Sequence, residues 1–113
     1  MAKAGAQAVI IQPLFDPHRA RLLELAIKHR LALMSSSRET TAAGGVISIS
    51  ANFLALYEQA ALYVDKIIKG ANPATLPVEQ PTKFQVVLNM KTAQALGLTI
   101  SPTLLAQADE VIE

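Results

Sequence analysis

The stretch AVIIQPLFDPHRARLLELAIKHRLALMSSS, residues 8–37, decides the expected fold of this chain. Two short apolar runs, residues 8–11 and 31–34, flank a segment with helical periodicity at residues 18–30. Apolar side chains recur in that segment at the spacing that lines one face of a helix, and most charges fall outside the stripe. The continuous apolar run at residues 8–11 is typical of a strand that is buried on both faces. Strand, helix and strand in this order predict a parallel pair joined by a helical crossover.

The rest of the chain continues this alternation. Asn52 is a good N-cap for the longest predicted helix, whose apolar stripe we expect to lie in a core or an interface, and Gly70 is a good C-terminal stop. The other elements are expected at residues 38–43, 46–50, 84–88 and 92–96 and after Ser101, with the longest helix at residues 53–69. The pattern predicts an α/β, Rossmann-like fold with a mainly parallel sheet flanked by helices.

The composition fits one compact domain that spans residues 1–113. The chain has 113 residues, 51% of them hydrophobic and 17% charged, and a formal net charge of +1. Charged residues interrupt every long apolar stretch, so no membrane-spanning helix is expected. With near-zero net charge and five aromatic residues, a nucleic-acid partner is not expected either. There is no cysteine, which excludes disulfides and thiolate sites.

The residues provide no catalytic or metal-binding constellation. His18 and His29 lie at opposite ends of the predicted helix 18–30, about three turns apart, so they cannot share a metal. We interpret both as capping or surface histidines. Asp16 and Glu39 are not linked by any pattern, and Gly44-Gly45 lacks the spacing of a phosphate loop and is read as a turn. We therefore predict no enzyme activity, no metal and no cofactor.

Serines follow or occupy two of the predicted strands. Ser35, Ser36 and Ser37 come directly after residues 31–34, and Ser48 and Ser50 alternate in the next strand. Ligands of open α/β sheets bind at the carboxyl ends of strands, so these hydroxyls are candidates for holding a polar solute. The alternative is that small polar residues simply form a loop there. No G-x-S-x-G elbow surrounds any of them, which disfavours a serine hydrolase.

Several motifs, taken together, resemble one protein family. They include YVDKIIKGANP at residues 63–73, LPVEQPTKF at 76–84, NMKTA at 89–93, LGL at 96–98 and ADEVI at 108–112. Shorter matches are HRAR at residues 18–21, KHRL at 28–31, RE at 38–39 and AGG at 43–45. Over nearly its whole length the chain is similar to the C-terminal third of the ABC-transporter substrate-binding protein family.

This resemblance implies part of a periplasmic-binding-protein type I fold, in which two Rossmann-like lobes enclose a cleft. Residues 1–51 would form a βαβ part of the second lobe, and residues 52–113 would return to the first lobe. The implied function is the capture of a small solute, such as an amino acid, for an ABC permease. Relatives work in the periplasm or at the cell surface, whereas this chain as written has no signal peptide and would stay in the cytoplasm.

The resemblance also implies which positions border the cleft. This chain differs from the family at these positions. It has Gln12-Pro13 where the family has Asp-Pro, and Ser48-Ile49-Ser50 where the family has Ser-Tyr-Gly. It has Ser35-Ser36-Ser37 where the family has Tyr-Pro-Phe. The predicted ligand-binding residues are Gln12, Pro13, Leu14, Ser35, Ser36, Ser37, Ser48, Ile49 and Ser50. The alternative is a truncated or degenerate remnant without ligand, which forms a homodimer to cover the apolar faces that the missing lobe would otherwise contact.

Overall fold

The structure, a computed structural model, describes residues 4–113, so residues 1–3 of the predicted domain lie outside it. The chain divides into two compact units. The first, here called the sheet unit, comprises the chain up to Ser50 together with Gln85–Glu113. The second, the helix unit, comprises Ala51–Phe84. Residues 85–113 share a unit with the first 50 residues, and the predicted assignment of residues 1–51 and 52–113 to two lobes stays a prediction.

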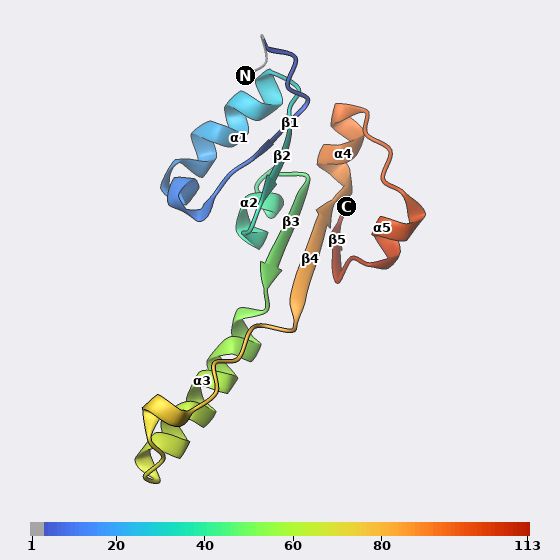
Figure 1. Cartoon of the computed structure of the whole chain (residues 1–113). Helices are drawn as coiled ribbons and strands as arrows, with labels where there is room; N and C mark the ends of the chain where they lie inside the picture. The colour runs from blue at the N-terminus through green and yellow to red at the C-terminus, as the bar shows by residue number, and fades with distance from the viewer. Residues whose placement is uncertain (1–3) are drawn as a thin grey trace. The chain divides into compact units, whose positions relative to one another are not determined.

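One five-stranded sheet organises the sheet unit and explains this division (Figure 1). Three of the neighbouring pairs are parallel, namely β1 with β2, β2 with β3, and β4 with β5. The arrows of β3 and β4 point in opposite directions in Figure 1, so the sheet is mainly parallel, as predicted. The strands, which lie in the sheet in chain order, are β1 (Ala8–Ile10), β2 (Ala32–Ser35), β3 (Ile47–Ala51), β4 (Phe84–Asn89) and β5 (Glu110–Ile112).

The helices lie where the sequence pattern expects them, with ends that shift by a few residues. The segment before α1 is a 3-10 helix. Within residues 4–113, every helix falls short of the length and hydrophobicity that a bilayer-spanning segment needs. The bounds are η2 (Pro13–His18), α1 (Arg19–Lys28), α2 (Arg38–Ala42), α3 (Phe53–Ile68), η3 (Pro73–Thr75), α4 (Met90–Leu96) and α5 (Pro102–Ala106).

The packed core of the sheet unit lies between α1 and the first two strands. Leu23 and Ala26 of α1 are buried there together with Ile11, Leu31 and Leu33. Ile10, in contrast, is 72% exposed. The expectation that the first strand is buried on both faces is therefore wrong, because β1 ends the strand order and only one of its faces packs on this core.

The helix unit consists of α3 and the segment that follows it to Phe84. Asn52 caps α3 as predicted, since its side-chain oxygen accepts a hydrogen bond from Ala55 N at 3.1 Å. The following segment is tied to the helix by Asn52 N donating to Lys83 O at 2.9 Å, and by Tyr63 Oη donating to Pro77 O at 2.6 Å. No residue of α3 is buried within the described chain. Its apolar stripe is therefore not part of a core here, and its role as an interface stays a prediction.

Gly45 lies where α2 and β3 approach each other too closely for a side chain. A Cβ atom there would lie 3.1 Å from Thr40 O and 3.2 Å from Thr41 Cα, both of which are backbone atoms that cannot turn away. We therefore expect Gly45→Ala to lower the free energy of unfolding by about 1–3 kcal/mol in chemical denaturation. Ala42→Ser, on an exposed residue of α2, is the control and should change it by less than about 0.5 kcal/mol. Equal midpoints for the two variants would contradict the close approach.

Candidate functional site

The carboxyl ends of β1, β2 and β3 meet at one edge of the sheet. Parallel pairing matches Ile10 with Met34 and Ser35 with Ser48, so the three strands run in the same direction, and β3 extends three residues beyond the end of β2. This arrangement gathers residues from three separate sequence segments. We call them the strand-end edge: Gln12, Pro13, Leu14, Ser36, Ser37, Ile49 and Ser50.

Two predicted site residues lie beneath this edge. Ser35 is 3% exposed and Ser48 is 1% exposed. The Ser35 hydroxyl donates to Ser37 O and accepts from Ser37 N, both at 3.1 Å, so it shapes the loop that follows β2. The Ser48 hydroxyl has no hydrogen-bond partner among residues 4–113. A solute at the edge would meet the other predicted residues first, and ligand contact by any of the nine stays a prediction.

Ser37 has a structural role at the start of α2. Its hydroxyl oxygen accepts a hydrogen bond from Thr40 N at 3.3 Å, which makes it the N-cap, and the hydroxyl donates to Glu39 Oε2 at 2.8 Å. A backbone hydrogen bond and this Ser37 hydroxyl hold the pKa of Glu39 below its ordinary value. Capping therefore uses much of the hydrogen-bonding capacity of Ser37 and pre-orders the loop.

The remaining residues of the strand-end edge are accessible. Gln12 is the N-cap residue of η2, but its side chain makes no capping bond. Leu14 is 78% exposed and Ile49 is 40% exposed. Ser36 and Ser50 are half-buried. The edge thus combines one amide and two hydroxyls with apolar surface, a mixture suited to a small polar solute.

An ion pair that sequence reasoning missed lies beside this edge. Arg38, the first residue of α2, donates from Nε to Glu110 Oε2 at 2.7 Å and from Nη2 to Glu110 Oε1 at 2.5 Å. The pKa of Glu110 lies below its ordinary value, chiefly because of the hydrogen bond from Arg38. The two residues are 72 positions apart, and no sequence pattern relates them. The pair ties α2 to β5.

Because the folded protein lowers the pKa of Glu110, the ion pair stabilises the fold above the ordinary carboxyl range, and this stabilisation disappears as the pH falls through the lowered pKa. Glu110→Gln should therefore lower the Tm at pH 7, and the difference from the unmodified protein should shrink below about pH 4. Thermal unfolding at several pH values measures this difference. Arg38→Gln should give the same pH profile, and a difference that stays constant with pH would exclude the linkage.

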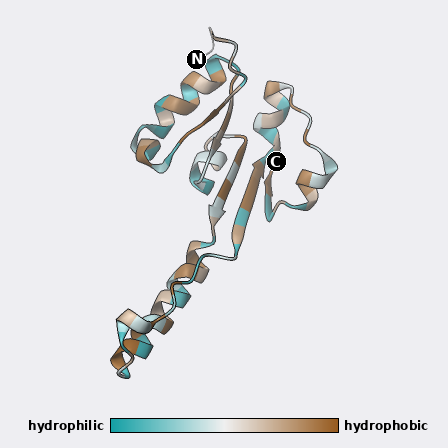
Figure 2. Cartoon of the chain, viewed as in Figure 1, coloured by the Kyte–Doolittle hydropathy of each residue, from teal (hydrophilic) through white to brown (hydrophobic). Residues whose placement is uncertain are grey.

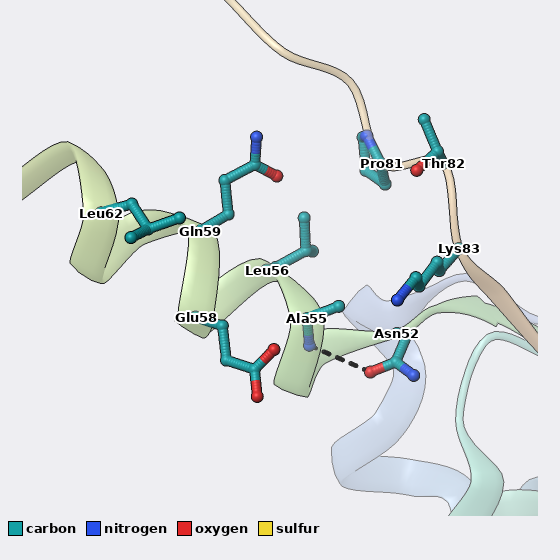
Figure 3. Close-up of a pocket in the computed structure, with 9 residues that line it drawn as sticks. All are labelled: Asn52, Ala55, Leu56, Glu58, Gln59, Leu62, Pro81, Thr82 and Lys83. Carbon is teal, nitrogen blue, oxygen red and sulfur yellow. Dashed lines mark hydrogen bonds between the residues drawn. The ribbon is translucent and has the colours of Figure 1, made fainter.

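A separate hollow of about 270 Å³ lies within the helix unit (Figure 3). α3 forms one side and the segment at residues 81–83 forms the other. Glu58 and Lys83 give it one charge of each sign, and Leu56 and Leu62 give it apolar surface. None of the nine predicted ligand residues lines it. The sequence indicated Asn52 as a helix cap and residues 81–83 as part of a family motif, but it did not predict a hollow, because the hollow depends on how the following segment returns along the helix.

The histidines occupy the positions expected for capping or surface residues. His18 and His29 are the residues that flank α1 at its two ends, and both are exposed. Among residues 4–113, no group of three or more histidine and acidic side chains is placed to hold a metal ion. The described residues therefore give no geometric basis for a metal centre.

The sheet, its crossover helices and its strand-end edge define part of a periplasmic-binding-protein type I fold. The sequence model of the family described as ABC transporter substrate binding protein matches residues 5–112. The chain therefore belongs to the ABC transporter substrate-binding protein family, as the sequence motifs predicted. A search of curated proteins found no match.

Solved structures with this fold are similar over nearly the whole chain. A conserved domain protein from Vibrio cholerae has a TM-score of 0.83 at 20% identity, over 93% of this chain and 36% of its own. An ABC domain in complex with L-Trp from Streptococcus pneumoniae has a TM-score of 0.82 at 25% identity, and the match covers 94% of this chain and 38% of that protein. A ligand-free, open substrate binding protein with adhesive properties from Clostridium difficile has a TM-score of 0.70 at 14% identity, and the match covers 93% of this chain and 36% of that protein. The chain thus spans little more than a third of the length of these proteins.

Proposed function

We propose that this chain is the C-terminal part of a solute-binding component of an ABC transporter, and that its strand-end edge forms one wall of the site that captures a small molecule such as an amino acid. The observation that carries the proposal is the parallel register of β1, β2 and β3, which brings the segments after β1 and β2 and the last residues of β3 to one edge. Family membership and the ligand rule for open α/β sheets support it. The proposed role is to bind the solute without catalysing a reaction on it.

The character of the edge favours a neutral or zwitterionic solute. Gln12, Ser36 and Ser50 offer uncharged donors and acceptors, and Leu14 and Ile49 offer apolar contacts. The guanidinium of Arg38, beside the edge, already binds the carboxylate of Glu110, so this pair adds little net charge. Amino acids fit this combination, and the L-Trp complex of the streptococcal structure is a relevant precedent.

The partners follow from the same proposal. The segment at residues 51–84 would contact a first lobe, and a permease would receive the solute from the assembled protein. On this proposal the protein acts in the periplasm or at the cell surface. The predicted division after residue 51 would then mark the point where the chain leaves the second lobe, and the helix unit would be the segment that leaves it.

Titration calorimetry against the common L-amino acids tests solute binding. We expect at least one of them to bind, and Gln12→Ala to weaken binding by about 2- to 10-fold, as the loss of one neutral hydrogen bond would. Gln107→Ala, at an exposed residue after α5, is the matched control and should leave binding unchanged. A folded protein that binds none of them, or equal weakening by both variants, would refute the proposal.

The second candidate is a homodimeric domain without ligand, and the surface of α3 specifically favours it. Large apolar side chains of this helix are strongly exposed, among them Leu54 at 70%, Tyr57 at 73% and Ile68 at 79%. Figure 2 shows hydrophobic segments along most of the helix. Contiguous apolar surface of this kind marks contact sites in soluble proteins. A second copy of the chain would cover it in a symmetric pair.

Light scattering with size-exclusion chromatography separates the two candidates. If α3 mediates a dimer, Leu54→Glu together with Ile68→Glu should convert it to a monomer, because each buried charge would be unpaired. Val78→Glu, at a residue of the same unit that is 97% exposed, is the control and should leave the dimer intact. A monomer already in the unmodified protein would exclude the homodimer.

A further inference from the structure

A hollow in the sheet unit lies at the opposite edge of the sheet from the strand-end edge. Its walls are the end of α1, the turn after α2, and α4, and it encloses about 510 Å³. Residues that precede β2 and β3, namely Arg30 and Gly44, line it together with Asn89, the last residue of β4. We call it the opposite-edge pocket. None of the nine predicted ligand residues lines it.

The charges at this pocket have one sign. Arg30 and Lys91 line it, and no acidic residue does. Within residues 4–113, neither of these two cations takes part in an ion pair. Lys91 also borders a neighbouring hollow together with Glu113, a carboxylate that Arg30 does not share there. The pocket is therefore electrostatically suited to an anion.

The polar wall of the pocket is pre-ordered. Asn89 is 5% exposed, and its Nδ2 donates to Thr41 O at 2.9 Å while its Oδ1 accepts from Thr92 N at 2.9 Å. These bonds hold the last turn of α2 against the start of α4. Ile27 and Leu96 add apolar surface. A ligand here would meet a fixed wall with an apolar part and a cationic rim.

The backbone of Arg30 provides an independent observation. Arg30 has φ +53°, in the left-handed region, and it ends α1 with Leu31 N donating to Ala26 O at 2.8 Å and Arg30 N donating to Ile27 O at 3.0 Å. Glycine adopts this conformation at lower cost, and the chain places Gly70 and Gly97 at the equivalent ends of α3 and α4. An arginine is uncommon at such a position, and this residue lines the pocket, which motivates a functional hypothesis for its side chain.

We propose that the opposite-edge pocket binds a small organic carboxylate with a compact apolar body, and that Arg30 is its main anion contact, with Lys91 as the second. The volume lies within the range of about 300–1,000 Å³ that is typical of small-molecule sites. A guanidinium binds a carboxylate through two parallel hydrogen bonds, which a lysine cannot do. The site is distinct from the strand-end edge and does not depend on the solute proposed above.

An NMR titration of the ¹⁵N-labelled chain with 3-phenylpropanoate tests this site, with the uncharged 3-phenylpropanamide as the matched probe. We expect saturable shifts at the amides of Gly44, Thr92 and Ala95, with a dissociation constant on the order of millimolar, as a ligand of this size reaches. The amides of Gln12, Ser36 and Ser50 should stay unshifted. The uncharged probe should bind at least about tenfold more weakly.

Arg30→Gly is the decisive variant, because glycine keeps the left-handed turn and removes only the side chain. It should weaken binding of 3-phenylpropanoate by about tenfold or more, and Lys91→Gln by a smaller factor. Lys28→Gln, at an exposed cation outside the pocket, should have no effect. Equal affinity for the two probes, shifts confined to the strand-end edge, or unchanged binding in Arg30→Gly would each overturn the proposal.

Discussion

Leu88→Ala is expected to lower the free energy of unfolding of the sheet unit by about 2–5 kcal/mol. Leu88 is 0% exposed in β4, the strand that lies between β3 and β5. Shortening it removes apolar contacts and leaves a cavity that neighbouring strands cannot close, because hydrogen bonds hold their backbones. Urea denaturation followed by circular dichroism measures the change.

The same substitution at an exposed leucine is the matched control. Leu14 belongs to the same unit and is 78% exposed, so Leu14→Ala removes identical atoms from a side chain that buries little surface. It should change the free energy of unfolding by less than about 0.5 kcal/mol. If the two variants were equally stable, β4 would not be a central strand of this sheet, and the strand order would be refuted.

Asn89→Ala is the second substitution for which a large effect is expected. The side chain of Asn89 caps α4 through Thr92 N and also donates to Thr41 O, which belongs to α2. Alanine leaves the N–H of Thr92 without its side-chain acceptor and removes one of two donors to the buried Thr41 O, which keeps the hydrogen bond from Gly44 N at 3.2 Å. We therefore expect a loss of about 1–3 kcal/mol, the sum of an N-cap and one further hydrogen bond. Part of this loss comes from the hydrogen bond between Asn89 and Thr41, which joins two segments that are 48 residues apart in the chain.

Asn52→Ala separates the two contributions of Asn89. Asn52 caps α3 through Ala55 N with the same geometry, but it makes no second side-chain hydrogen bond among the described residues. Its loss should therefore cost about 1 kcal/mol, as removal of a simple N-cap does. Chemical denaturation of both variants gives the comparison. Equal costs would mean that the bond from Asn89 to Thr41 contributes nothing to stability.

Local patterns predicted most of the secondary structure. The N-cap at Asn52 and the stop at Gly70 define α3 because capping depends on residues only a few positions apart. β5 was missed, since a strand of three residues, Glu110–Ile112, carries too few positions for any periodicity. Its place is determined by pairing with β4, which matches Val87 with Glu110.

The candidate site was predicted in part. Serines after β2 and in β3 indicated a polar strand end, and the parallel register does bring these segments together. Their burial was not visible in the sequence, because the alternation in β3 does not say which face is covered, and Ser48 lies on the buried one. The ion pair of Arg38 with Glu110 and the pocket beside Arg30 were not predictable either, since their residues are distant in the chain.

The sequence by itself determined the class of fold, the family and the ends of the main helices, because these depend on composition, motifs and contacts between near neighbours. Only the tertiary structure decided that residues 85–113 complete the sheet begun by the first 50, that Ser35 and Ser48 are buried, and that Arg30 and Lys91 line one pocket. Each of these depends on strand pairing or packing between segments far apart in the chain, which local periodicity does not encode.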